Sequence, residues 1–345
     1  MTTSAPPPLV AIDDLHVVYP PSRASRDLAG RGRPVRAVDG VSIEVRAGEV
    51  LALVGESGSG KTTLAMALMR LVPATSGRII YRGEDITRLV GAGLRRLRRR
   101  FQIVFQDPYE SLDPRQTVGD IVLEPLLIHG VGATGGERTI LVTRALESVG
   151  LTPAEEFVGR FPHQLSGGQR QRVSIAAAMI LEPDLVVADE PVSMLDVSVR
   201  AGILRLILDL RAARGFACLF ITHDLSLAWV LADRIAVLYL GRVVEIGPAG
   251  SLFSSPRHPY TRALISVVPM PRPGAHRTQE ILEGETPSPA ATPTGCRFHP
   301  RCPLRRRLGN PEICERVDPA LEPVGPEWAA ACHFAMEEPD ARPGA

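Results

Sequence analysis

The residues best suited to do chemistry form one glycine-rich stretch, Gly55-Glu56-Ser57-Gly58-Ser59-Gly60-Lys61-Thr62. It matches the pattern G-x-x-x-x-G-K-[ST], whose glycines let main-chain N–H groups close around phosphate oxygens. In this pattern Lys61 reaches the β- and γ-phosphates of a nucleoside triphosphate, and the Thr62 hydroxyl ligates Mg²⁺. Lys61 is the only lysine among 39 Lys and Arg residues, which favours a specific role for its compact ammonium group. The stretch therefore predicts a phosphate loop.

A pair of acids follows an apolar run further along the chain, at Asp189 and Glu190 after residues 185–188. Downstream of a phosphate loop, an acid at the end of a buried strand is suited to hold Mg²⁺ through its water shell. The next acid is suited to orient and deprotonate an attacking water molecule. We therefore expect Asp189 to serve Mg²⁺ and Glu190 to be the general base.

The elements that must position these residues follow from the apolar pattern. Strands are predicted over 10–19 and 41–45, with a loop over 22–36 between them, and this part is expected to form an antiparallel β layer. A strand over 50–54 leads into the phosphate loop, and a helix from residue 61 to about 71 leads out of it. Buried parallel strands are predicted over 102–105, 185–188 and 218–221, and helices over 173–180 and 199–214. This alternation predicts an α/β fold with helices on both faces of the sheet.

Length, charge and composition limit the classes of protein to which the chain can belong. A chain of 345 residues suggests a main domain with a smaller appendage, and a net charge of +1 shows no overall preference for nucleic acid or an anionic membrane. Residues 1–8 are polar and Pro-rich, so they are expected to be disordered and do not resemble a secretion signal. No apolar stretch reaches the roughly 20 residues needed to cross a bilayer. A role in transport would thus require another polypeptide to form the channel.

Four of the five cysteines are spaced C-x₅-C-x₁₁-C-x₁₇-C, at Cys296, Cys302, Cys314 and Cys332. Thiolate sites of this kind suit zinc or an iron–sulfur cluster, and spacing alone does not separate the two. The C-x₂₋₄-C pair usual in zinc sites is absent, and free thiols remain a third alternative. Cys218, inside a predicted strand, is expected to be a core residue.

Between the loop and the acids lies Leu165-Ser166-Gly167-Gly168-Gln169, and with it the sequence resembles the ABC ATPase family. Ser166 is suited to cap a helix whose first N–H groups form a second anion site. In the family this element faces the γ-phosphate held by the other subunit of a head-to-tail dimer. The resemblance further implies that Gln106 contacts Mg²⁺ and water, that His223 binds the γ-phosphate, that Asp196 communicates across the dimer, and that Tyr19 stacks on adenine.

The resemblance thus implies three overlapping sets of site residues. The catalytic set is Lys61, Gln106, Glu190 and His223, and the Mg²⁺ set is Thr62, Gln106 and Asp189. The ATP-binding set is Tyr19, Gly55, Glu56, Ser57, Gly58, Ser59, Gly60, Lys61, Thr62, Thr63, Ser166, Gly167, Gly168, Gln169 and Asp196.

A narrower resemblance rests on residues 105–115 (FQDPYESLDPR), residues 257–261 (RHPYT) and the cysteine tail. Together these look like the ATP-binding subunits of oligopeptide and dipeptide importers, more specifically their second ATPase type, although Asp113 replaces a common asparagine. The family implies a second, related ATPase subunit as heterodimer partner, two membrane permease subunits and an external peptide-binding protein. It also implies a [4Fe–4S] cluster on the four tail cysteines, with Zn²⁺ as the alternative.

The sequence therefore predicts a P-loop NTPase of ABC type with an antiparallel β subdomain, a helical subdomain and a Cys-containing C-terminal extension. The expected nucleotide-binding domain spans 9–250, with its helical part at about 107–180, and the extension spans 251–345. The expected function is ATP hydrolysis that energises peptide uptake, at the cytoplasmic face of the cell membrane and without nucleic acid. The alternatives are a soluble ABC ATPase of nucleic-acid repair or translation, and an importer of another solute such as nickel or glutathione.

Overall fold

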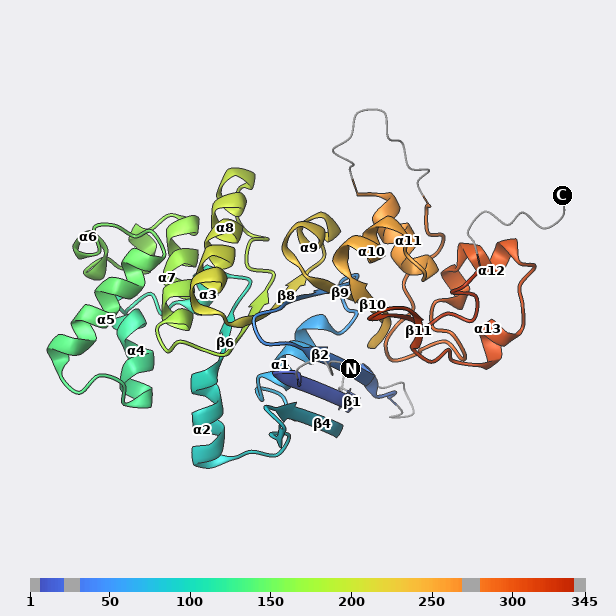
Figure 1. Cartoon of the computed structure of the whole chain (residues 1–345), viewed down its shortest axis with the longest axis horizontal. Helices are drawn as coiled ribbons and strands as arrows, with labels where there is room; N and C mark the ends of the chain where they lie inside the picture. The colour runs from blue at the N-terminus through green and yellow to red at the C-terminus, as the bar shows by residue number, and fades with distance from the viewer. Residues whose placement is uncertain (1–6, 22–31, 269–279, 338–345) are drawn as a thin grey trace, which may run out of the picture. The chain divides into compact units, whose positions relative to one another are not determined.

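The computed structural model describes residues 7–21, 32–268 and 280–337 (Figure 1). The chain folds as two compact units. The first comprises the described residues of Met1–Val10, Val45–Val50 and Tyr81–Ile221, and the second those of Ala11–Glu44, Leu51–Ile80 and Thr222–Ala345. The predicted loop over 22–36 lies mostly outside the described residues, as do residues 1–6 of the expected disordered N-terminus.

The N-terminal β layer of the second unit has the strand order β2-β1-β4, with β1 at Val10–Tyr19, β2 at Val35–Val45 and β4 at Ser76–Tyr81. Alternate side chains of β1 are buried, which is the period-two pattern that predicted it. The alternation shifts by one residue between Ile12 and Leu15, because Asp14 adopts a left-handed conformation with φ 46°. One face of the strand stays buried despite this irregularity.

A second sheet in this unit carries the phosphate loop. Strand β3 (Val50–Val54) pairs in parallel with β9 (Arg234–Tyr239), and β9 pairs antiparallel with β10 (Arg242–Pro248). Two short strands from the tail extend the sheet, because β12 (Trp328–Ala330) pairs with β10 and β11 (Glu322–Gly325) pairs with β12. Its helical elements are α1 (Lys61–Leu68), α9 (Leu225–Leu231), α10 (Ala249–Ser254), α11 (Pro259–Ser266), η3 (His299–Arg301), α12 (Pro303–Arg307) and α13 (Ile313–Arg316).

The tail and the sheet share one apolar core. Tyr239 of β9, Tyr260 of α11 and Phe298 are each at most 1% exposed, and their ring centroids lie 4.7 to 5.4 Å apart. Aromatic groups at such distances contribute about 0.5–1.5 kcal/mol per pair beyond their buried area. Residues beyond 250 therefore fold onto the strands that precede them.

The first unit holds three parallel strands, β6 (Phe101–Val104), β7 (Leu185–Asp189) and β8 (Ala217–Thr222), with β7 paired to both others. Its remaining elements are β5 (Glu84–Asp85), α2 (Gly91–Arg100), α3 (Pro108–Ser111), α4 (Val118–His129), α5 (Gly135–Ser148), α6 (Glu155–Val158), η2 (Pro162–Gln164), α7 (Gly167–Met179) and α8 (Val197–Arg214). Figure 1 shows α4, α5 and α7 packed together as a helical part of this unit.

The predicted strands and helices of the cores are present, with ends that differ by a few residues. The largest differences are at β2, which begins six residues before the predicted start at Val41, and at α7, which begins at Gly167 rather than Val173. Both added segments contain glycine or polar residues, which hide the apolar period. Within the described residues, no helix is long and apolar enough to cross a membrane.

Candidate functional site

The phosphate loop connects β3 to α1, as the motif requires. A Cβ atom at Gly60 would lie 2.1 Å from the Ala37 carbonyl oxygen, and one at Gly55 would lie 2.2 Å from that of Leu238. Gly60 also has φ 104°, a conformation that L side chains rarely adopt. These two close approaches explain why glycine occupies both positions.

Side chains of the loop are arranged to receive an anion. Lys61 is 6% exposed, and its ammonium group donates to the carbonyl oxygens of Gly55 at 2.8 Å and Glu56 at 2.9 Å. The Ser59 hydroxyl is buried with no hydrogen-bond partner among the described residues, and orphaned polar atoms of this kind mark ligand sites. Thr62, on the first turn of α1, is exposed, so its hydroxyl is accessible to a metal ion. The chemistry of the loop therefore fits a nucleoside triphosphate with Mg²⁺.

The acidic end of β7 lies in the first unit. Asp189 is 6% exposed, and the next residue, Glu190, has a left-handed conformation with φ 46° while its N–H donates to the Ile221 carbonyl at 3.0 Å. Backbone strain of this kind is common at functional sites. The Gln106 amide, two residues after β6, donates to the Glu190 carboxylate at 3.3 Å. The structure thus brings together two of the predicted catalytic residues, and the predicted sharing of one Mg²⁺ by Thr62, Gln106 and Asp189 stays a prediction.

The predicted cap at Ser166 is confirmed. Its hydroxyl accepts the N–H of Gln169 at 3.3 Å, and the Gln169 side chain accepts the N–H of Ser166 at 3.0 Å, so the two residues form a capping box at the start of α7. A Cβ atom at Gly168 would lie 2.6 Å from the Val199 side chain. The exposed Ser166 and the glycines after it leave the start of α7 accessible to a ligand.

The remaining predicted residues lie at strand and helix ends. His223 is exposed directly after β8, Asp196 is exposed at the start of α8, and Tyr19 is 38% exposed at the end of β1. These positions are accessible to a ligand, and their roles stay predictions.

A buried acid that the sequence reasoning missed organises residues 257–261. Glu245 of β10 is fully buried, and it accepts the N–H groups of Arg257 at 2.8 Å and His258 at 2.9 Å and the indole N–H of Trp328 at 2.9 Å. Burial raises the pKa of Glu245, whereas these donors favour the carboxylate. Because Glu245 fixes the start of α11, it also fixes Tyr260 of that helix, whose hydroxyl accepts the N–H of Glu56 in the phosphate loop at 2.9 Å.

The four tail cysteines line one cavity of about 10 Å³, together with His299 and His333. Burial, with smaller contributions from the neighbouring thiols, raises the pKa of Cys296 and Cys332 to about 12. Among the described residues, however, no group of three or more His, Cys, Asp or Glu side chains is close enough to hold a metal ion. The four cysteines share the lining of one cavity, and the iron–sulfur cluster and its zinc alternative stay predictions.

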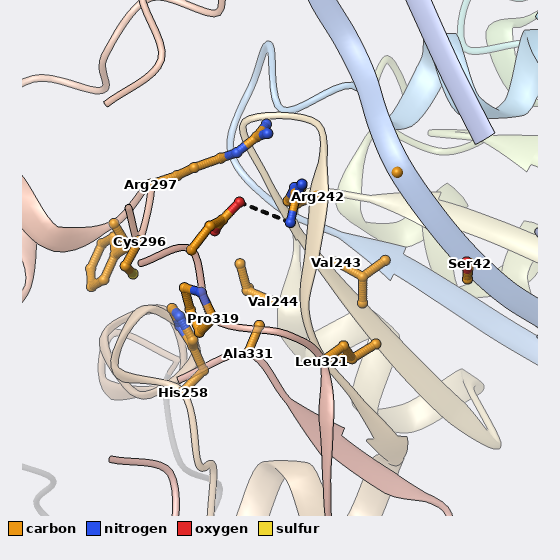
Figure 2. Close-up of a pocket in the computed structure, with 13 residues that line it drawn as sticks. Ser42, Arg242, Val243, Val244, His258, Cys296, Arg297, Pro319, Leu321 and Ala331 are labelled. Atoms are coloured by element: carbon orange, nitrogen blue, oxygen red, sulfur yellow. Dashed lines mark ion pairs between the residues drawn. The ribbon is translucent and has the colours of Figure 1, made fainter. Parts of the chain in front are cut away.

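A larger pocket of about 290 Å³ lies beside Cys296 (Figure 2). Figure 2 shows Arg242 on its wall, where the guanidinium group pairs with Asp318 at 2.8 Å. Arg297, which also lines it, pairs with Asp39. Because both cationic groups are already paired with carboxylates, we assign no ligand to this pocket.

Comparison with known proteins decides the family. A family model described as ABC transporter matches residues 38–193, and one described as Oligopeptide/dipeptide transporter, C-terminal region, matches residues 244–307. The oligopeptide transport ATP-binding protein AppF of Bacillus subtilis is 44% identical over 87% of this chain and 90% of its own length. The chain belongs to the ATP-binding proteins of the oligopeptide/dipeptide ABC transporter family. A protein of Sinorhizobium fredii, named probable peptide ABC transporter ATP-binding protein y4tS, is 50% identical over 87% of this ATPase and 82% of its own length.

A solved structure supports the same assignment. The dimeric post-hydrolysis state of the ATP-binding cassette MJ0796, bound to ADP and Pi, is 29% identical with a TM-score of 0.61, over 70% of this ATPase and 98% of that chain. The P-loop NTPase fold, the resemblance to peptide importers and ATP hydrolysis by this family member are therefore confirmed. The comparisons do not favour a soluble ATPase of nucleic-acid repair or translation.

Proposed function

We propose that this ATPase energises the uptake of oligopeptides or dipeptides through a membrane transporter. The observation that carries the proposal is the presence, in one chain, of the ABC transporter match and the oligopeptide/dipeptide C-terminal match. The first supplies the phosphate loop and the acidic strand end, and the second occurs in transporters for peptides. Nickel and glutathione remain cargoes that the experiment below distinguishes.

The catalytic roles follow from the chemistry of the side chains. Lys61 binds the β- and γ-phosphates, and the N–H groups of the loop and of the first turn of α1 surround them. Glu190 accepts a proton from the attacking water, and Gln106, bonded to it at 3.3 Å, orients that carboxylate and the water. Mg²⁺ would be held through Thr62, Gln106 and Asp189, and it would neutralise charge on the phosphate oxygens.

Partners complete the proposed transporter. We infer a heterodimer in which the capped start of α7 meets the γ-phosphate bound by a second, related ATPase subunit, supported by the accessible Ser166. The segment after Gln106 would contact a permease subunit and so place the ATPase at the cytoplasmic face of the membrane. In that segment Tyr109 of α3 is 58% exposed, and the Arg170 guanidinium lies 4.0 Å from its ring centroid.

The four tail cysteines would hold a [4Fe–4S] cluster, because thiolates are the donors that such a cluster requires. The four thiols line one cavity, and thiolates are also donors for zinc, so the experiment below separates the two. Such a cluster would cross-link the tail through four thiolates.

Anaerobically purified protein should be brown, with about four iron and four sulfide per chain. Cys302→Ser should lose the colour, whereas Cys218→Ser, which alters a core residue of β8, should keep it. Colourless protein with one zinc per chain, or with neither metal, would contradict the assignment.

The transport proposal is tested by reconstituting this ATPase in vesicles with permease subunits, a second ATPase subunit and a binding protein from the same organism. Peptides added with the binding protein should stimulate ATP hydrolysis and accumulate in vesicles, and Glu190→Gln should abolish both effects. Stimulation by nickel or glutathione, with none by peptides, would reassign the cargo.

A further inference from the structure

One residue of the phosphate loop, Glu56, is contacted from three places in the tail. The Arg301 guanidinium lies 3.0 Å and 3.3 Å from the two carboxylate oxygens, and the Thr286 hydroxyl donates to the same carboxylate at 2.5 Å. The Tyr260 hydroxyl accepts the main-chain N–H of Glu56 at 2.9 Å. All three partners lie more than 200 residues away in the sequence. The side chain and the backbone of Glu56 are thus both fixed by the tail.

Burial makes these contacts specific. Arg301 is 8% exposed and Tyr260 is fully buried, so a displacement of Glu56 would leave the Arg301 charge without its carboxylate partner and the Tyr260 hydroxyl without the N–H that it accepts. A guanidinium group meets both oxygens of a carboxylate through its planar fork, which fixes direction as well as distance. Glu56 itself presents a carbonyl oxygen that accepts from Lys61 at 2.9 Å. The tail therefore determines where the first turn of the loop lies.

A second arginine supports the far side of the loop. Arg297, also 8% exposed, donates to the Leu240 carbonyl and to the Asp39 carboxylate. The N–H of Gly241, next to Leu240, donates to the Ser59 carbonyl of the loop at 2.8 Å, and the Gly241 carbonyl accepts the N–H of Asp39 at 2.9 Å. Arg297 thus holds the segment that contacts the loop at Ser59 and, through Asp39, the segment whose Ala37 carbonyl lies against Gly60.

Both arginines belong to one tight turn, residues 296–302, which we call the arginine turn. The N–H of His299 donates to the Cys296 carbonyl at 3.0 Å, and that of Arg301 donates to the Phe298 carbonyl at 3.0 Å. Phe298 between them is 1% exposed in the aromatic core. The turn is therefore rigid. The Arg301 guanidinium extends to Glu56 of the loop, and the Arg297 guanidinium extends to Asp39 and Leu240 beside it.

We propose that the arginine turn holds the phosphate loop in its phosphate-binding conformation, and that Arg301 and Arg297 are positioning residues for ATP. A loop fixed in advance does not lose conformational freedom when it binds phosphate, so removing a support weakens binding. Fixing the backbone of one residue corresponds to a change in affinity of about 5- to 30-fold. The proposal rests on ATP binding at this loop and is independent of the peptide cargo.

The experiment compares ATP affinity and turnover in folded variants of the full chain. Arg301→Met removes the charge but keeps most of the side-chain volume, and Tyr260→Phe removes only the acceptor for the Glu56 N–H. Each should raise the Kd for a fluorescent ATP analogue with Mg²⁺ by about 5- to 30-fold while changing kcat by less than about twofold. Arg316→Met, which removes an exposed ion pair with Glu312 at 2.8 Å, is the matched control and should leave Kd unchanged.

A double-variant cycle identifies the pathway. If Arg301 acts through Glu56, then Arg301→Met combined with Glu56→Gln should weaken ATP binding less than the sum of the two single changes. Circular dichroism and thermal unfolding without nucleotide establish which variants fold. If Arg301→Met does not fold, Tyr260→Phe still tests the proposal. Unchanged or tighter ATP binding by a folded variant of either residue would overturn the proposal. Normal ATP binding in a transporter that moves no peptide would instead refute the proposed cargo.

Discussion

Burial of His258 should make the stability of this ATPase depend on pH. The ring is 1% exposed, and its Nδ1 accepts the N–H of Tyr260 at 3.1 Å, so that nitrogen carries no proton. Burial, with a smaller repulsion from Arg262, lowers the pKa of His258 to about 3 from a usual value of 6.5. Protonation would therefore break the hydrogen bond that caps α11 and place a charge in the core.

The sign and size of the effect follow from proton linkage. Between pH 6.5 and about pH 3 the unfolded chain binds a proton at His258 that the folded chain does not, so stability is full above pH 6.5 and falls as the pH is lowered. Each pH unit in this window corresponds to about 1.4 kcal/mol. Two units, from pH 6.5 to about pH 4.5, therefore remove about 3 kcal/mol of the free energy of unfolding.

Urea unfolding of the wild type and of His258→Asn, at several pH values from 7 to 4.5, measures this contribution. Asparagine keeps an oxygen that can accept the Tyr260 N–H but has no proton to gain, so the variant should lose about 3 kcal/mol less than the wild type over this range. His163→Asn, which changes an exposed histidine, should retain the wild-type dependence. If the free energy of unfolding fell equally with pH in the wild type and in His258→Asn, the reasoning would be refuted.

Three further predictions concern the loop, the base and the buried acid. Gly60→Ala would place a Cβ atom 2.1 Å from the Ala37 carbonyl oxygen at φ 104°, so it should abolish ATP binding in an equilibrium binding assay, and unchanged affinity would contradict the packing argument. Glu190→Gln should stop phosphate release yet retain ATP binding, and normal turnover would remove Glu190 from its role as base. Trp328→Phe takes a donor from buried Glu245 and should lower the free energy of unfolding by about 1–3 kcal/mol in denaturant titrations, and no measurable loss would count against that hydrogen bond.

The sequence predicted those parts of the fold in which the local order of apolar and polar residues matches the burial of each residue in the structure. The run over 50–54 is apolar because β3 is buried on both faces, and a glycine-rich motif beside it has few other conformations available. Ser166 and Gln169 are three residues apart, so the capping box they form is visible in the sequence. The contact of Gln106 with Glu190 was not predicted, because 84 residues separate the two, and the family resemblance implied only that Gln106 contacts Mg²⁺ and water.

The long-range contacts of the segment after the expected boundary near residue 250 are not visible in the local sequence pattern. Pro and turn residues after that point mark the expected C-terminal extension, whose β12 pairs with β10 and whose Phe298 packs in the same core as Tyr239. Strands of three or four residues leave almost no periodic signal, and a single buried aromatic residue in a polar segment leaves none. The tail is attached by contacts that become visible only when distant residues are brought together.

The same reason explains why the arginine turn was missed. The spacing of candidate ligand cysteines takes no account of the side chains between them, so the sequence analysis assigned no role to Arg297 or Arg301. Arginine is rarely buried without a partner, and here each arginine pairs with a carboxylate. Arg297 pairs with Asp39, 258 residues away and beside the phosphate loop, and Arg301 pairs with Glu56, 245 residues away and within the loop. Because the partners of two buried cations belong to the nucleotide site, the tail and the loop must be ordered together, and a change at either should be measurable at the other.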